Sequence, residues 1–130
     1  MATTWRRFLP MFEVSVEQTF AAGHALRNYK GACENVHGHN YRVQVGVQGP
    51  ELDENGLLYD FAELKKRLRG TTEYLDHQFL NDLKPFDEIN PSAENIAKFI
   101  YGEIQKELKT GTLAYVRVWE TDTSCAVYRP

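Results

Sequence analysis

The sequence predicts an α+β fold, in which two helices pack on one face of an antiparallel sheet. Residues 13–20 and 37–48 alternate apolar and polar side chains, with the period of two that is typical of strands. Residues 113–120 and 125–129 show the same alternation near the end of the chain. Between these two pairs, two segments carry apolar side chains at helical spacing behind capping residues. Strands grouped with strands, and helices with helices, are typical of this architecture.

The composition indicates one ordinary globular domain. The chain has 130 residues, 42% hydrophobic and 25% charged, and we interpret 1–11 as an N-terminal extension and 12–130 as the domain. A net charge of −3 without a clustered basic surface argues against nucleic-acid binding. No apolar run reaches the roughly 18 residues of a membrane span, and no signal-peptide core follows Arg6 and Arg7. Two cysteines are too few for a disulfide framework. We therefore expect a cytoplasmic protein that does not bind membranes.

The first two strands flank a loop. Val14, Val16 and Phe20 define one face of the first strand, and a glycine-bearing stretch, 21–35, follows it with His24 near its start. In the second strand, one face carries six alternate residues: His37, His39, Tyr41, Val43, Val45 and Val47. A turn at 53–56 and a short strand at 57–59 are predicted to follow, since Asn-Gly favours tight turns.

Each helix has a recognisable start. Asp60 and Glu63 form a potential capping box, and this helix is predicted to end near Gly70. Its buried face should contain Phe61, Leu64 and Leu68. Ser92 should cap the second helix, which ends near Gly111 and has a buried stripe formed by Ile96, Ile100, Ile104 and Leu108. A turn through Asp122 and Thr123 joins the last two strands, and Cys125 is interpreted as a small core residue.

Residues 33–39, Cys-Glu-Asn-Val-His-Gly-His, predict a metal site. On a strand, His37 and His39 point to the same face, roughly 7 Å apart along it. His24 lies near the end of the preceding antiparallel strand, close to the start of the next, and provides a third ligand. Three histidines with an open fourth position are typical of catalytic zinc. The alternative is that His37 and His39 are ordinary polar residues of a half-buried strand. A cupin-type site is excluded, because no carboxylate follows at Val43 or Gln44.

Three further positions have a functional and a structural interpretation. A cation near Cys33 would favour its thiolate, but Cys33 could instead be a fourth zinc ligand. Asp76 beside His77 suits proton transfer near neutral pH, although Asp and His are also common in turns. Glu120 continues the apolar face of its strand. It either pairs with a guanidine-like ligand edge, such as that of a pterin, or simply meets solvent at the strand end.

Together these segments resemble the family of 6-pyruvoyl-tetrahydropterin and 6-carboxy-tetrahydropterin synthases. The resemblance covers nearly all of residues 12–130. The segments that carry it, in chain order, are Phe20-Ala21-Ala22-Gly23-His24, Cys33-x-x-x-His37-Gly38-His39, Asp60-Phe61-Ala62-Glu63-Leu64-Lys65, Leu75-Asp76-His77, Asn90-Pro91-Ser92-Ala93-Glu94-Asn95 and Trp119-Glu120-Thr121. In combination and in this order, they are highly specific.

The resemblance implies a fold, a metal and a set of roles. The fold would be the tunnelling fold: a four-stranded antiparallel sheet with two helices on one face. Trimers close the sheets into a barrel, two trimers stack, and active sites lie between subunits. Zinc would be bound by the three histidines, His24, His37 and His39. Cys33 would accept a proton, and Asp76 with His77 would form a relay. Glu120, often counted with that relay, would bind the pterin ring together with Thr121.

The spacing between Cys33 and His37 resembles one branch of the family. Three residues separate them, as in the bacterial carboxy-tetrahydropterin synthases of the queuosine pathway, whereas animal-type pyruvoyl synthases have five. The implied reaction converts 7,8-dihydroneopterin triphosphate to 6-carboxy-5,6,7,8-tetrahydropterin, acetaldehyde and triphosphate. The alternatives are a pyruvoyl-tetrahydropterin synthase and a non-catalytic pterin- or metal-binding relative. A third branch uses a glutamate in place of the cysteine; Cys33 argues against it, although Glu34 is adjacent.

Overall fold

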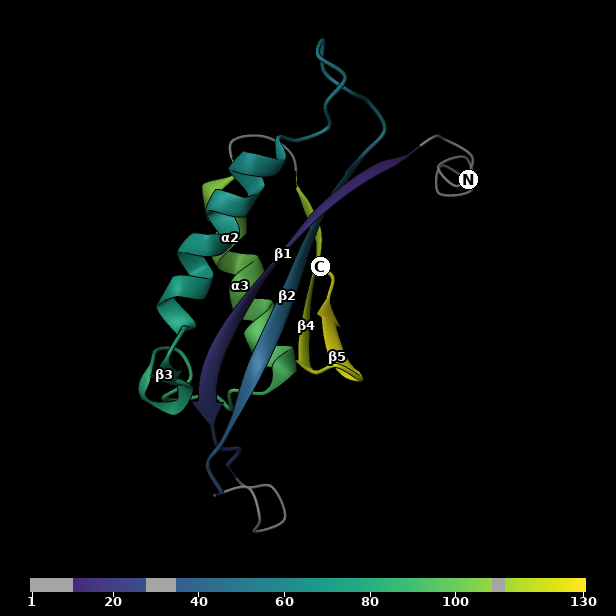
Figure 1. Ribbon diagram of the computed structural model, residues 1–130. Helices are drawn as coiled ribbons and strands as arrows, with labels where there is room; N and C mark the ends of the chain where they lie inside the picture. The colour runs from purple at the N-terminus through teal and green to yellow at the C-terminus, as the bar shows by residue number, and fades with distance from the viewer. Residues whose placement is uncertain (1–10, 28–34, 109–111) are drawn as a thin grey trace.

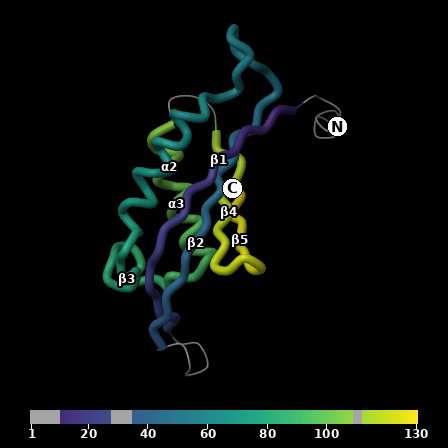
Figure 2. Tube along the Cα trace, viewed as in Figure 1, coloured from purple at the N-terminus to yellow at the C-terminus, as the bar shows by residue number. Residues whose placement is uncertain are grey.

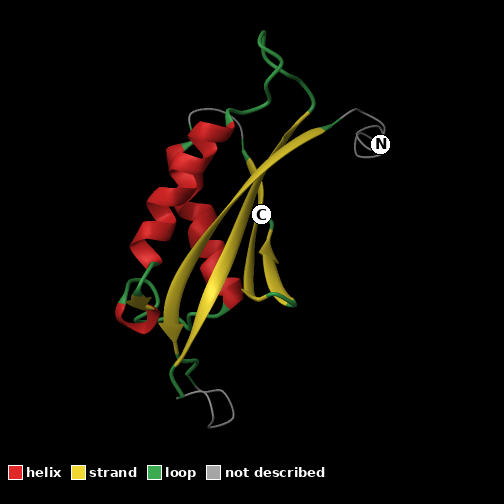
Figure 3. Cartoon of the chain, in the orientation of Figure 1, coloured by secondary structure: helices red, strands yellow, loops and turns green. Residues whose placement is uncertain are grey.

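The computed structural model describes residues 11–27, 35–108 and 112–130. Figure 1 shows the helices gathered on one face of a twisted sheet, and Figure 3 separates the two layers by colour. In chain order, the elements are β1 (Phe12–His24), β2 (His37–Gly49), α2 (Phe61–Leu75), β3 (Gln78–Phe79), the 3-10 helix η1 (Leu80–Asp82), α3 (Ala93–Glu107), β4 (Leu113–Thr121) and β5 (Ser124–Tyr128).

The sheet has five strands in the order β3-β1-β2-β4-β5. The predicted sheet of four antiparallel strands is therefore wrong in one respect. The two-residue strand β3 adds to the outer edge of β1 in parallel, which makes the sheet mixed. The four longer strands pair antiparallel, as predicted. Two residues between turns carry no alternation in the sequence, so β3 could not be predicted from periodicity.

The first two strands form a long ribbon, whose course is easiest to follow in the tube of Figure 2. β1 and β2 pair over their whole length, from Phe12 opposite Gly49 to His24 opposite His37. The strand predicted at 13–20 extends to His24. The buried residues Phe20, Ala22 and His24 keep the period of two, and this pairing with β2 extends the strand.

Helix α2 starts as predicted and ends later. Asp60 caps it by accepting a hydrogen bond from the backbone N–H of Ala62 at 2.8 Å. Glu63 binds Arg67 of the next turn at 2.7 Å, rather than reaching back toward the cap. The helix continues past Gly70 to Leu75, whose side chain is buried.

Three smaller predictions are wrong in this region and at the end of the sheet. Residues 57–59 form no strand. Phe61, at the first position of α2, is exposed, whereas Leu64 and Leu68 are buried. Cys125 is exposed rather than part of the core, because its face of β5 is the one turned away from the helices.

Helix α3 follows its prediction closely at the start. The Ser92 hydroxyl accepts a hydrogen bond from the backbone N–H of Asn95 at 3.1 Å. Ile96, Ile100 and Ile104 are fully or almost fully buried. The helix ends at Glu107, and the predicted end at Gly111 lies outside the described residues.

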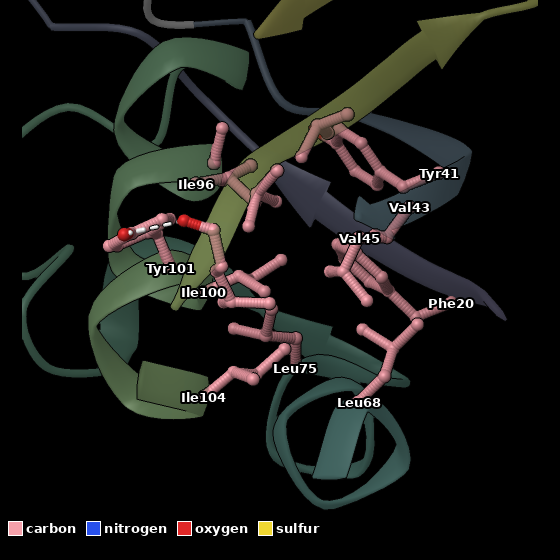
Figure 4. Close-up of a cluster of buried hydrophobic side chains, with 14 of the residues drawn as sticks. Phe20, Tyr41, Val43, Val45, Leu68, Leu75, Ile96, Ile100, Tyr101 and Ile104 are labelled. Atoms are coloured by element: carbon pink, nitrogen blue, oxygen red, sulfur yellow. Dashed lines mark hydrogen bonds between the residues drawn. The ribbon is translucent and has the colours of Figure 1, made fainter. Parts of the chain in front are cut away.

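The core lies between the helices and the inner face of the sheet, where α2 packs on β1 and α3 on β4 and β5. Figure 4 shows side chains of both helices meeting those of the sheet, with Tyr101 donating to the Leu113 carbonyl at 2.9 Å. Within the described part of the chain, no helix is both long and apolar enough to cross a membrane. This core fixes the inner face of the β1–β2 ribbon, at whose end the histidines lie.

Candidate active site

Three histidines converge where β1 ends and β2 begins. The antiparallel register sets His24 opposite His37 and Ala22 opposite His39, so all three imidazoles share the inner face of the ribbon. The ring centroid of His24 lies 4.8 Å from that of His37 and 5.2 Å from that of His39. The His37 and His39 rings are 5.4 Å apart. The structure therefore brings together the three residues that the sequence predicted as metal ligands.

A hydrogen bond from Nδ1 fixes the orientation of the His24 ring. His24 is 1% exposed, and its Nδ1 lies 2.7 Å from the backbone carbonyl oxygen of Pro91. A carbonyl only accepts hydrogen bonds, so Nδ1 carries the hydrogen and the neutral ring has its lone pair on Nε2. A backbone carbonyl behind the ring is the usual arrangement for a histidine that binds a metal.

Glu120 closes the cluster from the neighbouring strand. Its Oε1 lies 2.9 Å from Nε2 of His39 and 3.5 Å from Nε2 of His24. Trp119 pairs with Cys125 and Thr121 with Ser124, which makes Glu120 the extra residue of a β-bulge. Bulges redirect side chains and are frequent beside active sites. The sequence indicated a carboxylate on the apolar face, but it could not indicate the bulge.

The donor set fits a metal ion. One ligand atom from each of the four residues, three histidines and Glu120, lies within 4.8 Å of the others. Among the described residues, Nε2 of His24 and Nε2 of His39 are buried without a properly oriented hydrogen bond. Lone pairs of a carboxylate and imidazoles that point at one another repel unless a cation lies between them. Imidazole and carboxylate ligands in this number suit zinc and related divalent ions.

The state of His39 favours metal binding at neutral pH. Burial lowers the pKa of His39, and the nearby imidazoles of His24 and His37 lower it further. The Glu120 carboxylate acts in the opposite direction but is outweighed. His39 is therefore neutral near pH 7 and offers a free lone pair, which metal coordination requires.

Tyr41 lies directly beneath the cluster. Its ring stacks on Phe20 at 4.8 Å and makes edge contacts with His24 and His39 at 5.9 and 5.5 Å. Burial raises the pKa of Tyr41, and the Glu120 carboxylate adds to this effect, so the hydroxyl stays protonated. The sequence placed Tyr41 on the same strand face as the histidines, but only the structure reveals that it supports two of their rings.

Asp76 and His77 form a pair attached to the edge of β1. Oδ2 of Asp76 lies 2.9 Å from Nδ1 of His77, while Oδ1 accepts a hydrogen bond from the Ala21 N–H at 2.8 Å. The backbone N–H of His77 donates in return to the Ala21 carbonyl at 2.6 Å. His77 has a φ of 59°, an uncommon value for a residue other than glycine. The predicted pairing of these neighbours is therefore present, and both residues are fixed to one residue of β1.

The charge state of the pair follows from these contacts. The Ala21 N–H has the largest effect in lowering the pKa of Asp76, and the hydrogen bond to His77 adds to it. The carboxylate thus stays ionised and holds the hydrogen of His77 on Nδ1. The other ring nitrogen is left available, on a side chain that is 82% exposed.

His77 of the pair and His39 of the cluster line one depression at the end of the ribbon. His77 lines this shallow depression of about 390 Å³ with Ala21, Gly23, Gly38 and Asn40, among others. In β1 and β2 these residues alternate with Ala22, His24 and His39, so they belong to the outer face. Ala22 and His39, which belong to the inner face, line the same depression. One chain thus presents its Asp-His pair at the sheet edge and its histidine cluster on the inner face.

Two predicted site residues remain, Cys33 and Thr121. Cys33 lies outside the described residues. Thr121 is exposed at the end of β4, where its hydroxyl accepts from the Thr123 N–H at 3.3 Å. A larger cavity, of about 700 Å³, lies between the two helices and is lined by Arg67, Tyr74 and Phe99, among others. None of the predicted site residues that the structure describes lines it.

The fold and the cluster define a small α+β protein with a histidine-rich candidate metal centre at the end of a β-ribbon. The family model described as 6-pyruvoyl tetrahydropterin synthase matches residues 13–130, and the chain belongs to this family of tetrahydropterin synthases. The predicted family is therefore confirmed.

The relatives include both branches of the family. The chain is 41% identical to a 6-carboxy-5,6,7,8-tetrahydropterin synthase of Bacillus subtilis, over 92% of this chain and 86% of the relative. It is 36% identical to the human 6-pyruvoyl tetrahydrobiopterin synthase, over 90% of each. The structure is similar to that of the Caenorhabditis elegans 6-pyruvoyl tetrahydropterin synthase, with a TM-score of 0.85 and 26% identity over 94% of this chain and 97% of that one.

Proposed function

We propose that the protein is a zinc-dependent carbon–carbon lyase. It converts 7,8-dihydroneopterin triphosphate to 6-carboxy-5,6,7,8-tetrahydropterin and releases acetaldehyde and triphosphate, as a step of queuosine biosynthesis. The observation that carries the proposal is the convergence of three imidazoles beside Glu120. The 41% identity to a bacterial relative named for the carboxy product supports this branch.

In this proposal His24, His37 and His39 hold the zinc, and a fourth position stays open for the substrate. The chemistry that the ion supplies is Lewis-acid polarisation of the side-chain hydroxyls of the substrate, which eases loss of a neighbouring carbon-bound proton. Two observations support this assignment. The Pro91 carbonyl accepts from Nδ1 of His24 and so directs its Nε2 toward the cluster, and burial favours the neutral ring of His39.

The chain's own groups move the protons. Cys33, as a thiolate, accepts the carbon-bound proton, because a nearby dication favours the ionised sulfur. Asp76 keeps the Nδ1 hydrogen of His77 in place, which leaves the second nitrogen free to accept or deliver a proton near neutral pH. The exposure of His77 supports this role, since an approaching substrate reaches the ring directly.

Glu120 and Thr121 bind the pterin in this proposal. A carboxylate accepts two parallel hydrogen bonds from the guanidine-like edge of a pterin ring. The Glu120 side chain is 31% exposed, and its Oε1 faces Nε2 of His39. In the same position Glu120 could instead be the fourth metal ligand. Zinc binding would depend on Glu120 in this second role but not in the first.

We further propose that each active site forms between subunits of a trimer whose sheets close into a barrel of the tunnelling fold, with two trimers stacked. The exposure of His77 at the sheet edge, at 82%, supports this arrangement, because the ring is accessible to a neighbouring subunit. The pair of one subunit would then serve the metal centre of its neighbour. Residues 12–130 make up the catalytic domain.

Product analysis tests the reaction. Purified protein loaded with zinc and incubated with 7,8-dihydroneopterin triphosphate should release acetaldehyde and form the 6-carboxy product. A pyruvoyl product alone would contradict the proposal. It would favour the second candidate function, a 6-pyruvoyl-tetrahydropterin synthase, to which the 36% identity with the human relative points. Absence of any turnover by zinc-loaded protein would indicate a non-catalytic relative.

A further inference from the structure

The outer edge of β1 stays hydrogen-bonded beyond the point where its neighbouring strand ends. Ala21 is paired with Asp76 and His77, and β3 pairs with the next two residues. After β3, two asparagine side chains take over the pairing, at Ala25 and at Arg27. Alternate residues of an extended chain present both N–H and C=O to the same edge, which explains the spacing.

Asn81, in η1, pairs with both backbone groups of Ala25. Its Oδ1 accepts from the Ala25 N–H at 2.9 Å, and its Nδ2 donates to the Ala25 carbonyl at 2.8 Å. The side-chain amide thus forms the two hydrogen bonds that a peptide group of a neighbouring strand would form. Ala25 directly follows His24, so this pairing fixes the backbone next to a proposed zinc ligand.

Asn90 repeats the arrangement two residues further along. Its Oδ1 accepts from the Arg27 N–H at 2.8 Å, and its Nδ2 donates to the Arg27 carbonyl at 3.0 Å. Asn90 is itself held by Asn95, whose Nδ2 donates to the Asn90 carbonyl at 2.9 Å. The guanidinium of Arg27 adds bonds to the carbonyls of Phe86 and Ile89, at 2.7 and 3.1 Å.

These contacts connect the backbone that follows His24 to the segment that orients its side chain. Asn90 binds Arg27, and the next residue, Pro91, provides the carbonyl that accepts from Nδ1 of His24. The segment 24–27 and the segment 90–91 are thus joined at both ends. A shift of Asn90 would therefore move the carbonyl that orients the His24 ring.

We propose that Asn81 and Asn90 are positioning residues of the metal centre, acting through His24. The inference rests on the proposed metal function, and neither residue touches the ion or the substrate. The pairing of two amides with four backbone groups keeps Nε2 of His24 aimed at the cluster. Residues that orient metal ligands typically change metal affinity about 10- to 100-fold when they are replaced.

Isosteric substitutions separate positioning from general packing. Asn81→Asp and Asn90→Asp keep the oxygen that accepts from a backbone N–H, but they replace the donor with a second acceptor facing a carbonyl. Asn55→Asp is the matched control, because Asn55 is exposed in a turn and the charge change is the same. Asn81→Ser and Asn90→Ser provide uncharged variants whose shorter side chain has one polar atom in place of the two amide atoms that pair with the backbone N–H and C=O.

The measurement is zinc affinity by competition with a chromophoric chelator, together with the visible absorption of the cobalt-substituted protein. Folding of each variant is checked by circular dichroism without metal. We expect folded Asn81 and Asn90 variants to bind zinc about tenfold or more weakly than the wild type and to show an altered cobalt spectrum. Asn55→Asp should match the wild type within about twofold, since the change is remote from the ligands.

The outcomes distinguish this inference from the proposed function. A wild-type protein that binds no zinc would refute the metal function itself. A wild type that binds zinc, with folded Asn81 and Asn90 variants that bind it equally well, would overturn only the positioning role. The role would also be overturned if all four variants failed to fold, because the asparagines would then serve folding rather than the site.

Discussion

Nδ1 of His24 donates its hydrogen to the backbone carbonyl of Pro91, across 2.7 Å and 67 positions of sequence. This bond joins the end of β1 to the residues that precede α3, and it determines which nitrogen of His24 is free. The free nitrogen lies 3.5 Å from Glu120, at the centre of the cluster. This hydrogen bond therefore determines which nitrogen of His24 can bind a metal at the candidate centre.

Replacing Glu120 with glutamine distinguishes its two possible roles. If Glu120 binds the pterin, Glu120→Gln loses a charge-assisted pair worth about 1.5–3 kcal/mol, so KM should rise about 10- to 100-fold while zinc stays bound. Steady-state kinetics and metal analysis measure both. Glu88→Gln, an exposed carboxylate after η1, is the control. Loss of zinc from Glu120→Gln would identify Glu120 as a ligand instead.

The two cysteines provide a matched pair of variants. Cys33→Ala should lower kcat about 10²- to 10⁴-fold, the usual contribution of a general base, and should leave the zinc content unchanged. Cys125→Ala should keep full activity, because Cys125 is exposed on β5 and lies outside the histidine cluster. Full activity of Cys33→Ala would show that another group takes the proton.

Mixing two inactive variants tests whether active sites form between subunits. His24→Ala damages the metal centre and His77→Ala damages the proton relay. If the two parts come from different subunits, random co-assembly should restore about one quarter of wild-type activity, since half of the subunits carry each intact part. Subunit exchange is verified by mass spectrometry. Mixed oligomers that remain inactive would mean that each chain uses its own His77.

The pKa of Asp76 predicts a pH dependence of stability. Because the Ala21 N–H lowers this pKa in the folded state, the carboxylate stabilises the protein above its unfolded pKa of about 3.9. That contribution is lost as the pH falls through the lower folded value. Asp76→Asn should therefore be less stable than the wild type near pH 7, and the difference should shrink as the pH falls below about 4.

Urea unfolding at a series of pH values measures this dependence. Asp82→Asn, an exposed carboxylate in η1, serves as the control for general charge effects. A constant difference between wild type and Asp76→Asn from pH 7 to pH 2 would show that the Asp76 carboxylate is not held by β1.

Periodicity and capping residues were enough to predict the α+β fold and all four long strands. Asp60 and Ser92 cap their helices as predicted, because such caps depend only on local hydrogen bonds. The grouping of His24, His37 and His39 was also predictable, since consecutive antiparallel strands bring their adjoining ends together.

Other features depend on contacts between distant segments, and no local pattern encodes them. β3 forms by pairing with the edge of β1. The side chains of Asn81 and Asn90 continue this hydrogen bonding to the backbone of Ala25 and Arg27. The bulge at Glu120 depends on its pairing with β5. The adjacency of Asp76 and His77 in the sequence did not decide whether they are functional or part of a turn. The resemblance to a family indicated a functional role.

X-ray absorption at the zinc edge of the zinc-loaded protein tests the central claim most directly. We predict a first shell of nitrogen and oxygen atoms only, near 2.0–2.1 Å, with the scattering pattern of about three imidazoles. His24→Ala should lose one imidazole or the ion. A sulfur neighbour near 2.3 Å would contradict the account, because Cys33 would then be a ligand rather than the base. A shell without imidazole would contradict the metal centre itself.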